Sequence, residues 1–141
     1  MLVPGFKPYD ELPVYYALAK AFVHPSTSEQ WGLVVNEAIA SGLPVIVSNG
    51  CGCVPELVDG NGFTFDPFDE HELATRLLQM NALTDDERQQ LGEVSYTIAA
   101  NFAPDRFGEG LEQAATVAAN ARRTVGVMDR ALLIAAARFG A

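Results

Sequence analysis

The chain has 141 residues, 49% of them hydrophobic and 19% charged, which is typical of one globular domain and not of a disordered chain. Its net charge of −9 excludes nucleic acids and anionic membranes as expected partners, because no basic surface replaces their counterions. The longest apolar runs are too short to span a bilayer, and the first residues lack the regions of a signal peptide. We therefore expect a cytoplasmic protein without a transmembrane segment.

Strand and helix signals alternate along residues 1–83. We expect a weak strand at 1–6 and a helix that Asp10 caps and that ends near Lys20. The elements expected next are a strand at 21–25, a helix at 33–41, a strand at 44–48, a turn at 55–58 and a strand at 62–66. This alternation predicts an α/β fold with a doubly wound parallel sheet, whose ligands bind at the carboxyl ends of the strands.

Helix signals dominate the rest of the chain. Asp69 with Glu72 and Thr84 with Glu87 have the spacing of capping boxes, which mark helix starts. The helices expected are 69–80, 87–100, 104 to about 123, and 128–139. We expect 84–141 to be a helical tail of one partial domain, whose strand-and-helix region is 1–83.

The residues most suggestive of a site lie in the loop that follows the strand at 21–25 and in the helix at 33–41. Glu29 lies in this loop, and Gly32 opens the helix. The amides of Gly32, Leu33 and Val34 have no partners at a helix start and can hold a pyrophosphate. Glu37 follows about 6 Å further along the helix axis and can accept hydrogen bonds from sugar hydroxyls.

Two glutamates eight positions apart are common by chance, and Glu37 alone also fits an exposed helix residue. The full string is more specific: Pro-Ser, then Glu-x-Trp-Gly-Leu-Val, then Asn-Glu-Ala-x-Ala-x-Gly-x-Pro-Val, then Gly52, Pro55 and Glu56. It resembles the group 1 (family 4) glycosyltransferases of the GT-B fold and their Glu-x7-Glu motif. The resemblance covers roughly Val3 to Pro67.

The resemblance implies a fold and a set of site residues. The chain corresponds to the later half of a GT-B C-terminal domain, a truncated Rossmann-like sheet followed by helices. Glu37 would bind the ribose of a nucleotide and Glu29 the hydroxyls of the transferred sugar, with the helix amides beside the donor. Ser26 and the loop from Gly52 to Glu56 would line the same cleft.

The resemblance also implies an activity. The parent enzyme would transfer a hexose from a nucleotide sugar to an acceptor with retention of configuration, without a metal or other cofactor. The family's phosphate-binding Arg and Lys and its acceptor site lie upstream, so we expect this chain alone to be inactive without an N-terminal domain or partner chain. In the family's sheet, residues 1–6 would correspond to a strand that is separated from the next strand of this chain by two strands that the chain lacks. We therefore expect residues 1–6 to be displaced, swapped or poorly ordered. An exposed sheet edge would favour self-association.

Other functions compete with a transferase segment. One is a stand-alone, non-catalytic binding module that pairs with a separate N-terminal chain. Another is a GT-B-like epimerase, which the Glu-x7-Glu string disfavours. Cys51 and Cys53 are spaced for a metal or a strained disulfide, but neither His24 nor His71 has a second ligand nearby in sequence. We therefore expect no metal site and free thiols in a reducing compartment.

Overall fold

The computed structural model describes residues 4–121. Between Ala103 and Pro104 the chain divides into two compact units, Met1–Ala103 and Pro104–Ala141. The described part of the second unit is mainly one helix, α6 (Pro104–Asn120). The first unit contains every described strand and all the residues predicted to form a site.

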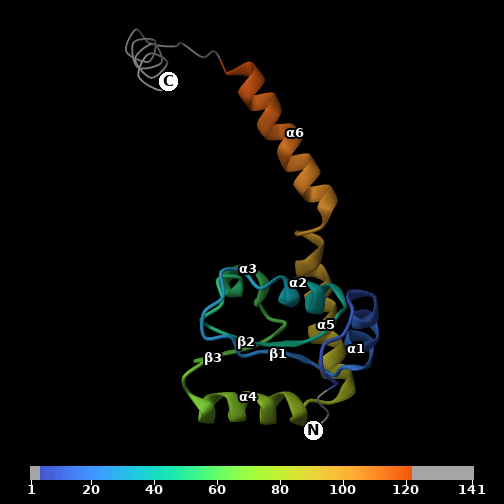
Figure 1. The fold of residues 1–141 in the computed structure, drawn as a ribbon, viewed down its shortest axis with the longest axis vertical. Coiled ribbons are helices and arrows are strands. Elements are labelled where there is room, and N and C mark those ends of the chain that lie inside the picture. The colour runs from blue at the N-terminus through green and yellow to red at the C-terminus, as the bar shows by residue number, and fades with distance from the viewer. Residues whose placement is uncertain (1–3, 122–141) are drawn as a thin grey trace. The chain divides into compact units, whose positions relative to one another are not determined.

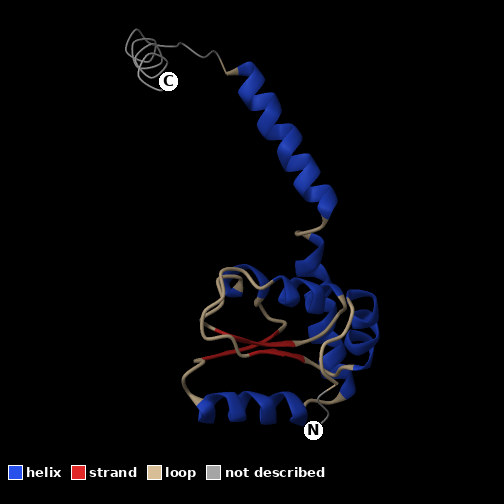
Figure 2. Ribbon diagram, in the orientation of Figure 1, coloured by secondary structure: helices blue, strands red, loops and turns tan. Residues whose placement is uncertain are grey.

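The first unit is built on a parallel three-stranded sheet (Figure 2). Its strands are β1 (Phe22–His24), β2 (Val45–Ser48) and β3 (Gly62–Phe65), in the order β1-β2-β3. Phe22 is opposite Val45, and Val45 is opposite Gly62. Every residue of β2 is buried, as expected for an apolar strand with parallel neighbours on both sides.

Helices lie on both faces of this sheet (Figure 1). On one face are α2 (Leu33–Ala40) and α3 (Val54–Leu57), and on the other is α4 (Glu70–Ala82). The unit also contains a 3-10 turn, η1 (Tyr9–Glu11), and the helices α1 (Leu12–Leu18) and α5 (Asp85–Ala100). The doubly wound α/β fold predicted from the sequence is thus confirmed.

The alternation of side chains along β2 divides the core into two clusters. Val45 and Val47 belong to the cluster under α2 and α3, and Ile46 belongs to the cluster under α4. The first cluster also contains Val35, Ala38, Ile39, Leu43, Cys51, Cys53 and Leu57, and the second contains Phe65 and Met80. Helix α5 packs against both, through Ile98 on one side and Leu91 on the other.

A buried polar network ties α5 to the sheet. The Asn61 side-chain amide donates to the Leu57 carbonyl at 3.0 Å and to Ser95 Oγ at 3.1 Å. Ser95 Oγ in turn donates to the Leu43 carbonyl at 2.7 Å. Asn61 and Ser95 are fully buried, so these bonds replace the water that both side chains lose on folding.

Most predicted elements appear within two residues of their expected bounds, but the described part of the first one is not a strand. Residues 4–6 form no strand, and the side chain of Phe6 is 94% exposed. Pro4 has no N–H to donate to a ladder, and residues 4–6 do not join the sheet of β1, β2 and β3. Residues 1–3 and the predicted helix at 128–139 lie outside the described residues.

The helix starts agree with the capping predictions to different degrees. Thr84 and Glu87 form the full capping box, with bonds of 2.7 and 3.2 Å in the two directions. Asp69 caps α4 by accepting from two backbone amides, but Glu72 bonds Asp66 and Arg76 instead of returning to Asp69. The predicted Asp10 cap is wrong.

The chain enters α1 through the 3-10 turn η1, and Glu11 occupies the N-cap position without a side-chain cap bond. Pro13, in the first turn, removes one of the amides that a capping side chain would bind. No described helix is both long and apolar enough to cross a membrane.

Removal of the Ser95 hydroxyl tests the polar network. We expect Ser95→Ala to lower the free energy of unfolding by about 1–3 kcal/mol, because it leaves the Leu43 carbonyl and the Asn61 amide short of buried partners. Thr97→Ala is the matched control, since this exposed hydroxyl bonds only its own helix, and we expect it to cost less than about 0.5 kcal/mol. Urea unfolding measures both. Equal effects would mean that the network does not stabilise the fold.

Candidate functional site

Two loops meet at the carboxyl edge of the sheet, one after β1 and one after β2. Glu29 N–H donates to the Gly50 carbonyl at 3.2 Å, and Gly52 N–H donates to the Glu29 carbonyl at 2.9 Å. Glu29 and Cys51 thereby form an isolated parallel bridge. The two loops that the sequence predicted to converge do so, and backbone bonds hold them together.

The alternation of glycine and cysteine in Gly50-Cys51-Gly52-Cys53 follows from this contact between the two loops. A Cβ atom on Gly52 would lie 2.1 Å from the Gln30 carbonyl oxygen, so the close approach of the two backbones requires glycine there. The two cysteines point the other way into the core, with 3% and 0% of their surfaces exposed. Sequence reasoning did not predict that both cysteines face the core, although their spacing of two residues indicates side chains on the same face of an extended segment.

Both cysteines are free thiols, as predicted. Burial raises the pKa of Cys53 to about 11, with the neighbouring Cys51 as the next cause. Burial, followed by the charge of Glu29, also raises the pKa of Cys51. The thiols therefore stay protonated and unreactive at neutral pH. Within residues 4–121, no group of three His, Cys, Asp or Glu side chains is arranged to hold a metal.

No side chain caps the first turn of α2, where Gly32 is buried and the two residues after it are exposed. Gly32 precedes the helix with φ 90° and ψ 68°, a left-handed conformation that favours glycine, and no side chain caps the helix at this residue. The next two residues, Leu33 and Val34, are 70% and 38% exposed. The sequence prediction that Gly32 opens a helix is confirmed, and the first amides of α2 lie at an exposed helix terminus with no intrahelical acceptors.

Glu29 lies directly before this helix start. Its carboxylate is half-buried, and Oε1 accepts a long bond of 3.4 Å from the Trp31 N–H. Trp31 fixes the entry to the helix, because its indole donates to Asn36 Oδ1 at 2.8 Å and its ring lies 5.8 Å from that of Phe102. Sequence reasoning missed the Trp31–Asn36 bond.

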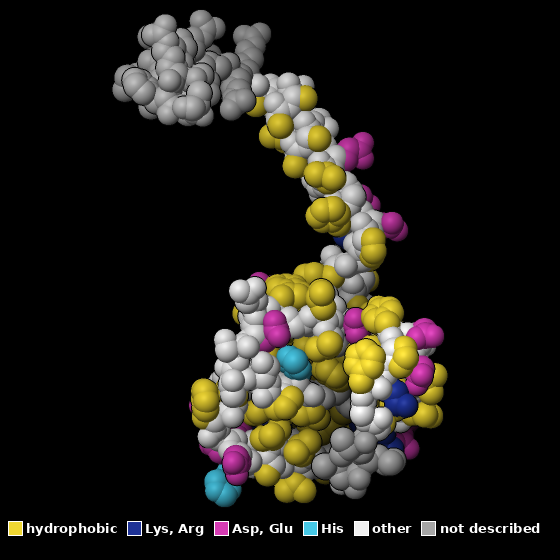
Figure 3. All heavy atoms as spheres, viewed as in Figure 1, with side chains coloured by type: hydrophobic (Ala, Val, Ile, Leu, Met, Phe, Trp, Pro, Cys, Tyr) yellow, Lys and Arg dark blue, Asp and Glu magenta, His cyan; other side chains and the backbone are white. Residues whose placement is uncertain are grey.

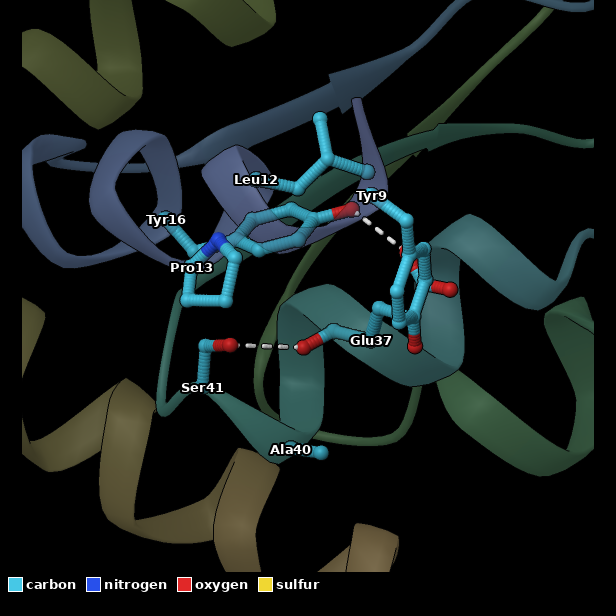
Figure 4. Close-up of a pocket in the computed structure, with 7 residues that line it drawn as sticks. All are labelled: Tyr9, Leu12, Pro13, Tyr16, Glu37, Ala40 and Ser41. Atoms are coloured by element: carbon cyan, nitrogen blue, oxygen red, sulfur yellow. Dashed lines mark hydrogen bonds between the residues drawn. The ribbon is translucent and has the colours of Figure 1, made fainter. Parts of the chain in front are cut away.

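Glu37 lies in the second turn of α2, beside a pocket of about 240 Å³ (Figure 4). The Tyr16 hydroxyl donates to Glu37 Oε2 at 2.9 Å, and Ser41 Oγ donates to the Glu37 carbonyl at 2.8 Å. The pocket is lined by Tyr9, Leu12, Pro13, Tyr16, Glu37, Ala40 and Ser41. No local pattern indicates a role for Tyr16, which lies 21 positions before its partner.

The other predicted site residues lie near the same edge of the sheet but have fewer contacts. Ser26 follows β1, and its hydroxyl donates to the Ser28 carbonyl at 3.2 Å. Glu56 lies in α3 with an exposed side chain. His24, at the end of β1, stacks on Phe22, and its buried Nε2 has no hydrogen-bond partner among residues 4–121. Donor contacts of Ser26, Gly52 and Glu56 stay predictions.

Cationic side chains are scarce around this edge of the sheet. Before Arg76 the sequence has only Lys7 and Lys20, and Lys7 forms an ion pair with Glu11 at 3.5 Å. Figure 3 shows the same scarcity on the visible face of the first unit, where hydrophobic side chains predominate. An anion bound here would depend on the helix amides for positive potential.

The parallel sheet, the helices on both its faces and the loops at its carboxyl edge define a partial Rossmann-like domain of the GT-B type. A structural comparison agrees: sucrose-phosphate synthase from Thermosynechococcus elongatus superposes with a TM-score of 0.70 at 29% identity, over 82% of this chain and 30% of that one. Residues 1–97 match the family described as "Glycosyl transferases group 1". The chain belongs to this family.

Curated relatives agree with the family assignment. O-antigen chain mannosyltransferase B of Escherichia coli is 38% identical over 87 residues, which are 62% of this chain and 22% of the relative. D-inositol 3-phosphate glycosyltransferase of Corynebacterium diphtheriae is 39% identical over 108 residues, or 75% of this chain and 25% of the relative. The chain thus spans about a quarter of the length of these relatives.

Substitution of Gly52 tests the contact between the two loops. We expect Gly52→Ala to lower the free energy of unfolding by about 1–3 kcal/mol, because its Cβ would overlap the Gln30 carbonyl oxygen and force the loops apart. Gly110→Ala is the control: no atom lies within 4 Å of its Cβ position, and alanine favours helix α6. Urea unfolding followed by tryptophan fluorescence reports on Trp31. An unchanged midpoint for Gly52→Ala would contradict the close approach.

We expect the Tyr16 hydroxyl to lose its proton at a higher pH in the folded protein than in the unfolded chain. Burial raises its pKa from 10.0 to about 12, and the hydrogen bond to Glu37 is the next cause. Because the folded-state pKa is the higher one, the group's contribution to stability is complete below pH 10 and is lost as pH rises towards 12. We expect Tyr16→Phe to remove this part of the alkaline decline in the free energy of unfolding, measured by urea unfolding at several pH values. An identical decline in both proteins would contradict the raised pKa.

Proposed function

We propose that this chain supplies the donor-binding half of the cleft in a retaining glycosyltransferase that transfers a hexose from a nucleotide sugar. The observation that carries the proposal is the placement of Glu29 and Glu37 on either side of the open start of α2. Family membership supports the reaction class. The hexose, the retention of configuration and the individual residue roles are part of the proposal.

In the proposed complex, the diphosphate of the donor lies against the amides of Gly32, Leu33 and Val34. The exposed helix start supports this placement, since unpaired N–H groups and the positive end of the helix dipole attract phosphate oxygens. Glu37 then accepts hydrogen bonds from the ribose hydroxyls, and Glu29 from hydroxyls of the sugar. Carboxylates suit this task because each has two acceptor oxygens.

Catalysis in this scheme depends on stabilising the charge that develops on the departing nucleoside diphosphate. The helix amides are fixed by the core of the first unit, so they need no reorganisation as that charge grows. Transfer without a metal is part of the proposal.

The chain covers about a quarter of the curated relatives, so the complete reaction is proposed for a larger assembly. We propose that this chain alone binds donor weakly and transfers no sugar, and that an N-terminal domain or partner chain supplies the acceptor site and further cations. The scarcity of Lys and Arg before Arg76 supports this division. A non-catalytic module has no comparable support, because the relatives named above are transferases.

Location and association complete the proposal. We propose a cytoplasmic location on the basis of the two free thiols, Cys51 and Cys53, which persist in reducing compartments. We also propose that the edge strands of the three-stranded sheet allow self-association, because an unpaired edge presents free backbone groups.

Nucleotide titration tests the proposed function. We expect the 141-residue chain to bind UDP or GDP, and Glu37→Ala to weaken that binding by at least about tenfold, since hydrogen bonds to a charged carboxylate are lost. Isothermal calorimetry measures the affinity. Glu93→Ala, on the exposed surface of α5, is the control for loss of a helical glutamate. If neither nucleotide binds, or if binding survives Glu37→Ala unchanged, the proposed donor site is wrong.

A further inference from the structure

The hydrogen bond between Tyr16 and Glu37 joins α1 to the helix that begins at the proposed donor site. The Tyr16 hydroxyl contacts Glu37 Oε2 at 2.9 Å, and both side chains are half-buried (Figure 4). Among residues 4–121 no other side chain or backbone group forms a hydrogen bond with this carboxylate. Oε1 is therefore unoccupied by protein donors in the described structure.

We propose that Tyr16 is a positioning residue, which holds the Glu37 carboxylate by Oε2 so that Oε1 is presented to the ribose hydroxyls of the donor. This inference rests on the proposed function and deepens it by adding a residue that does not touch the ligand. It concerns how the carboxylate is oriented before the nucleotide arrives.

The backbone of Glu37 is already fixed, so its side-chain torsions are the remaining freedom. The adjacent Ala38 and Ile39 and the preceding Val35 are fully buried in the core. Ser41 Oγ bonds the Glu37 carbonyl at 2.8 Å. A long carboxylate side chain on such a fixed helix still has several rotamers, and one hydrogen bond to Oε2 selects among them.

Tyr16 is itself well placed to act as a fixed donor. Its ring packs against the core cluster under α2, with its centroid 6.1 Å from that of Phe22. Burial and the bond to Glu37 raise the pKa of Tyr16 to about 12, so the hydroxyl keeps its proton at every physiological pH. A phenol that stays protonated, opposite a carboxylate that only accepts, gives a charge-assisted bond of constant direction.

The opposite role is physically possible and predicts the opposite result. If the Tyr16 hydroxyl competed with ribose for Glu37, its removal would free the carboxylate and tighten nucleotide binding. A purely structural tyrosine would instead affect every ligand of the site equally. The following experiment separates these outcomes.

The test compares ordinary nucleotides with analogues that lack the ribose hydroxyls. We expect Tyr16→Phe to weaken binding of UDP or GDP by about tenfold, the usual lower range for losing a group that orients a ligand-binding side chain. Affinity for the 2′,3′-dideoxy analogue should not change, because that ligand offers Glu37 no hydroxyl. In a Glu37→Ala background, Tyr16→Phe should have no further effect on binding.

Tyr15→Phe is the matched control, because it removes the neighbouring hydroxyl from the same helix and that hydroxyl has no hydrogen bond among the described residues. Tighter binding by Tyr16→Phe, unchanged binding, or an equal loss for both kinds of nucleotide would overturn the positioning role. If the unmodified chain binds no nucleotide, the proposed donor site itself fails, and the calorimetry distinguishes that result from a failure of Tyr16 alone.

A measurement without ligand tests the positioning role whether or not the chain binds a nucleotide. Three-bond scalar couplings in NMR report the side-chain rotamers of Glu37. We expect one dominant rotamer in the unmodified chain and in Tyr15→Phe, and averaged couplings in Tyr16→Phe. A single unchanged rotamer in Tyr16→Phe would show that the hydroxyl does not orient Glu37.

Discussion

The backbone pairing of Glu29 with Gly50 and Gly52 is the constraint on which the candidate site depends. Here two N–H groups and two carbonyls form an isolated parallel bridge in the loops that follow β1 and β2. The start of α2 is thereby fixed relative to the sheet, and with it the positions of both glutamates.

Much of this arrangement could be predicted from the sequence because local signals determine it. The apolar run of β2, the Thr84–Glu87 box and the Gly32 helix start each depend on residues close together in the chain. The strand and helix pattern predicted Glu29 on a loop and Glu37 on the following helix. Both positions agree with the structure, while their contacts with a donor stay predictions.

The rest could not be predicted because it depends on contacts between distant segments. Tyr16 reaches Glu37 across 21 positions, and Ser95 reaches Leu43 across 52. No local pattern distinguishes these side chains from other tyrosines and serines on helices. The Asp10 cap failed for a local reason: the spacing favoured a helix start there, but the chain first makes a 3-10 turn and then places Pro13 in the first turn.

The buried Ser95 has a consequence for the length of chain that is needed to complete this fold. The Leu43 carbonyl, directly before the central strand, receives its bond from a residue that the chain adds 52 positions later. A ribosome must therefore release most of α5 before the loop entering β2 has its full set of partners. The strands and loops of the candidate site precede that point, so during synthesis they emerge before the helix that closes their core, and the smallest self-sufficient piece must extend through α5.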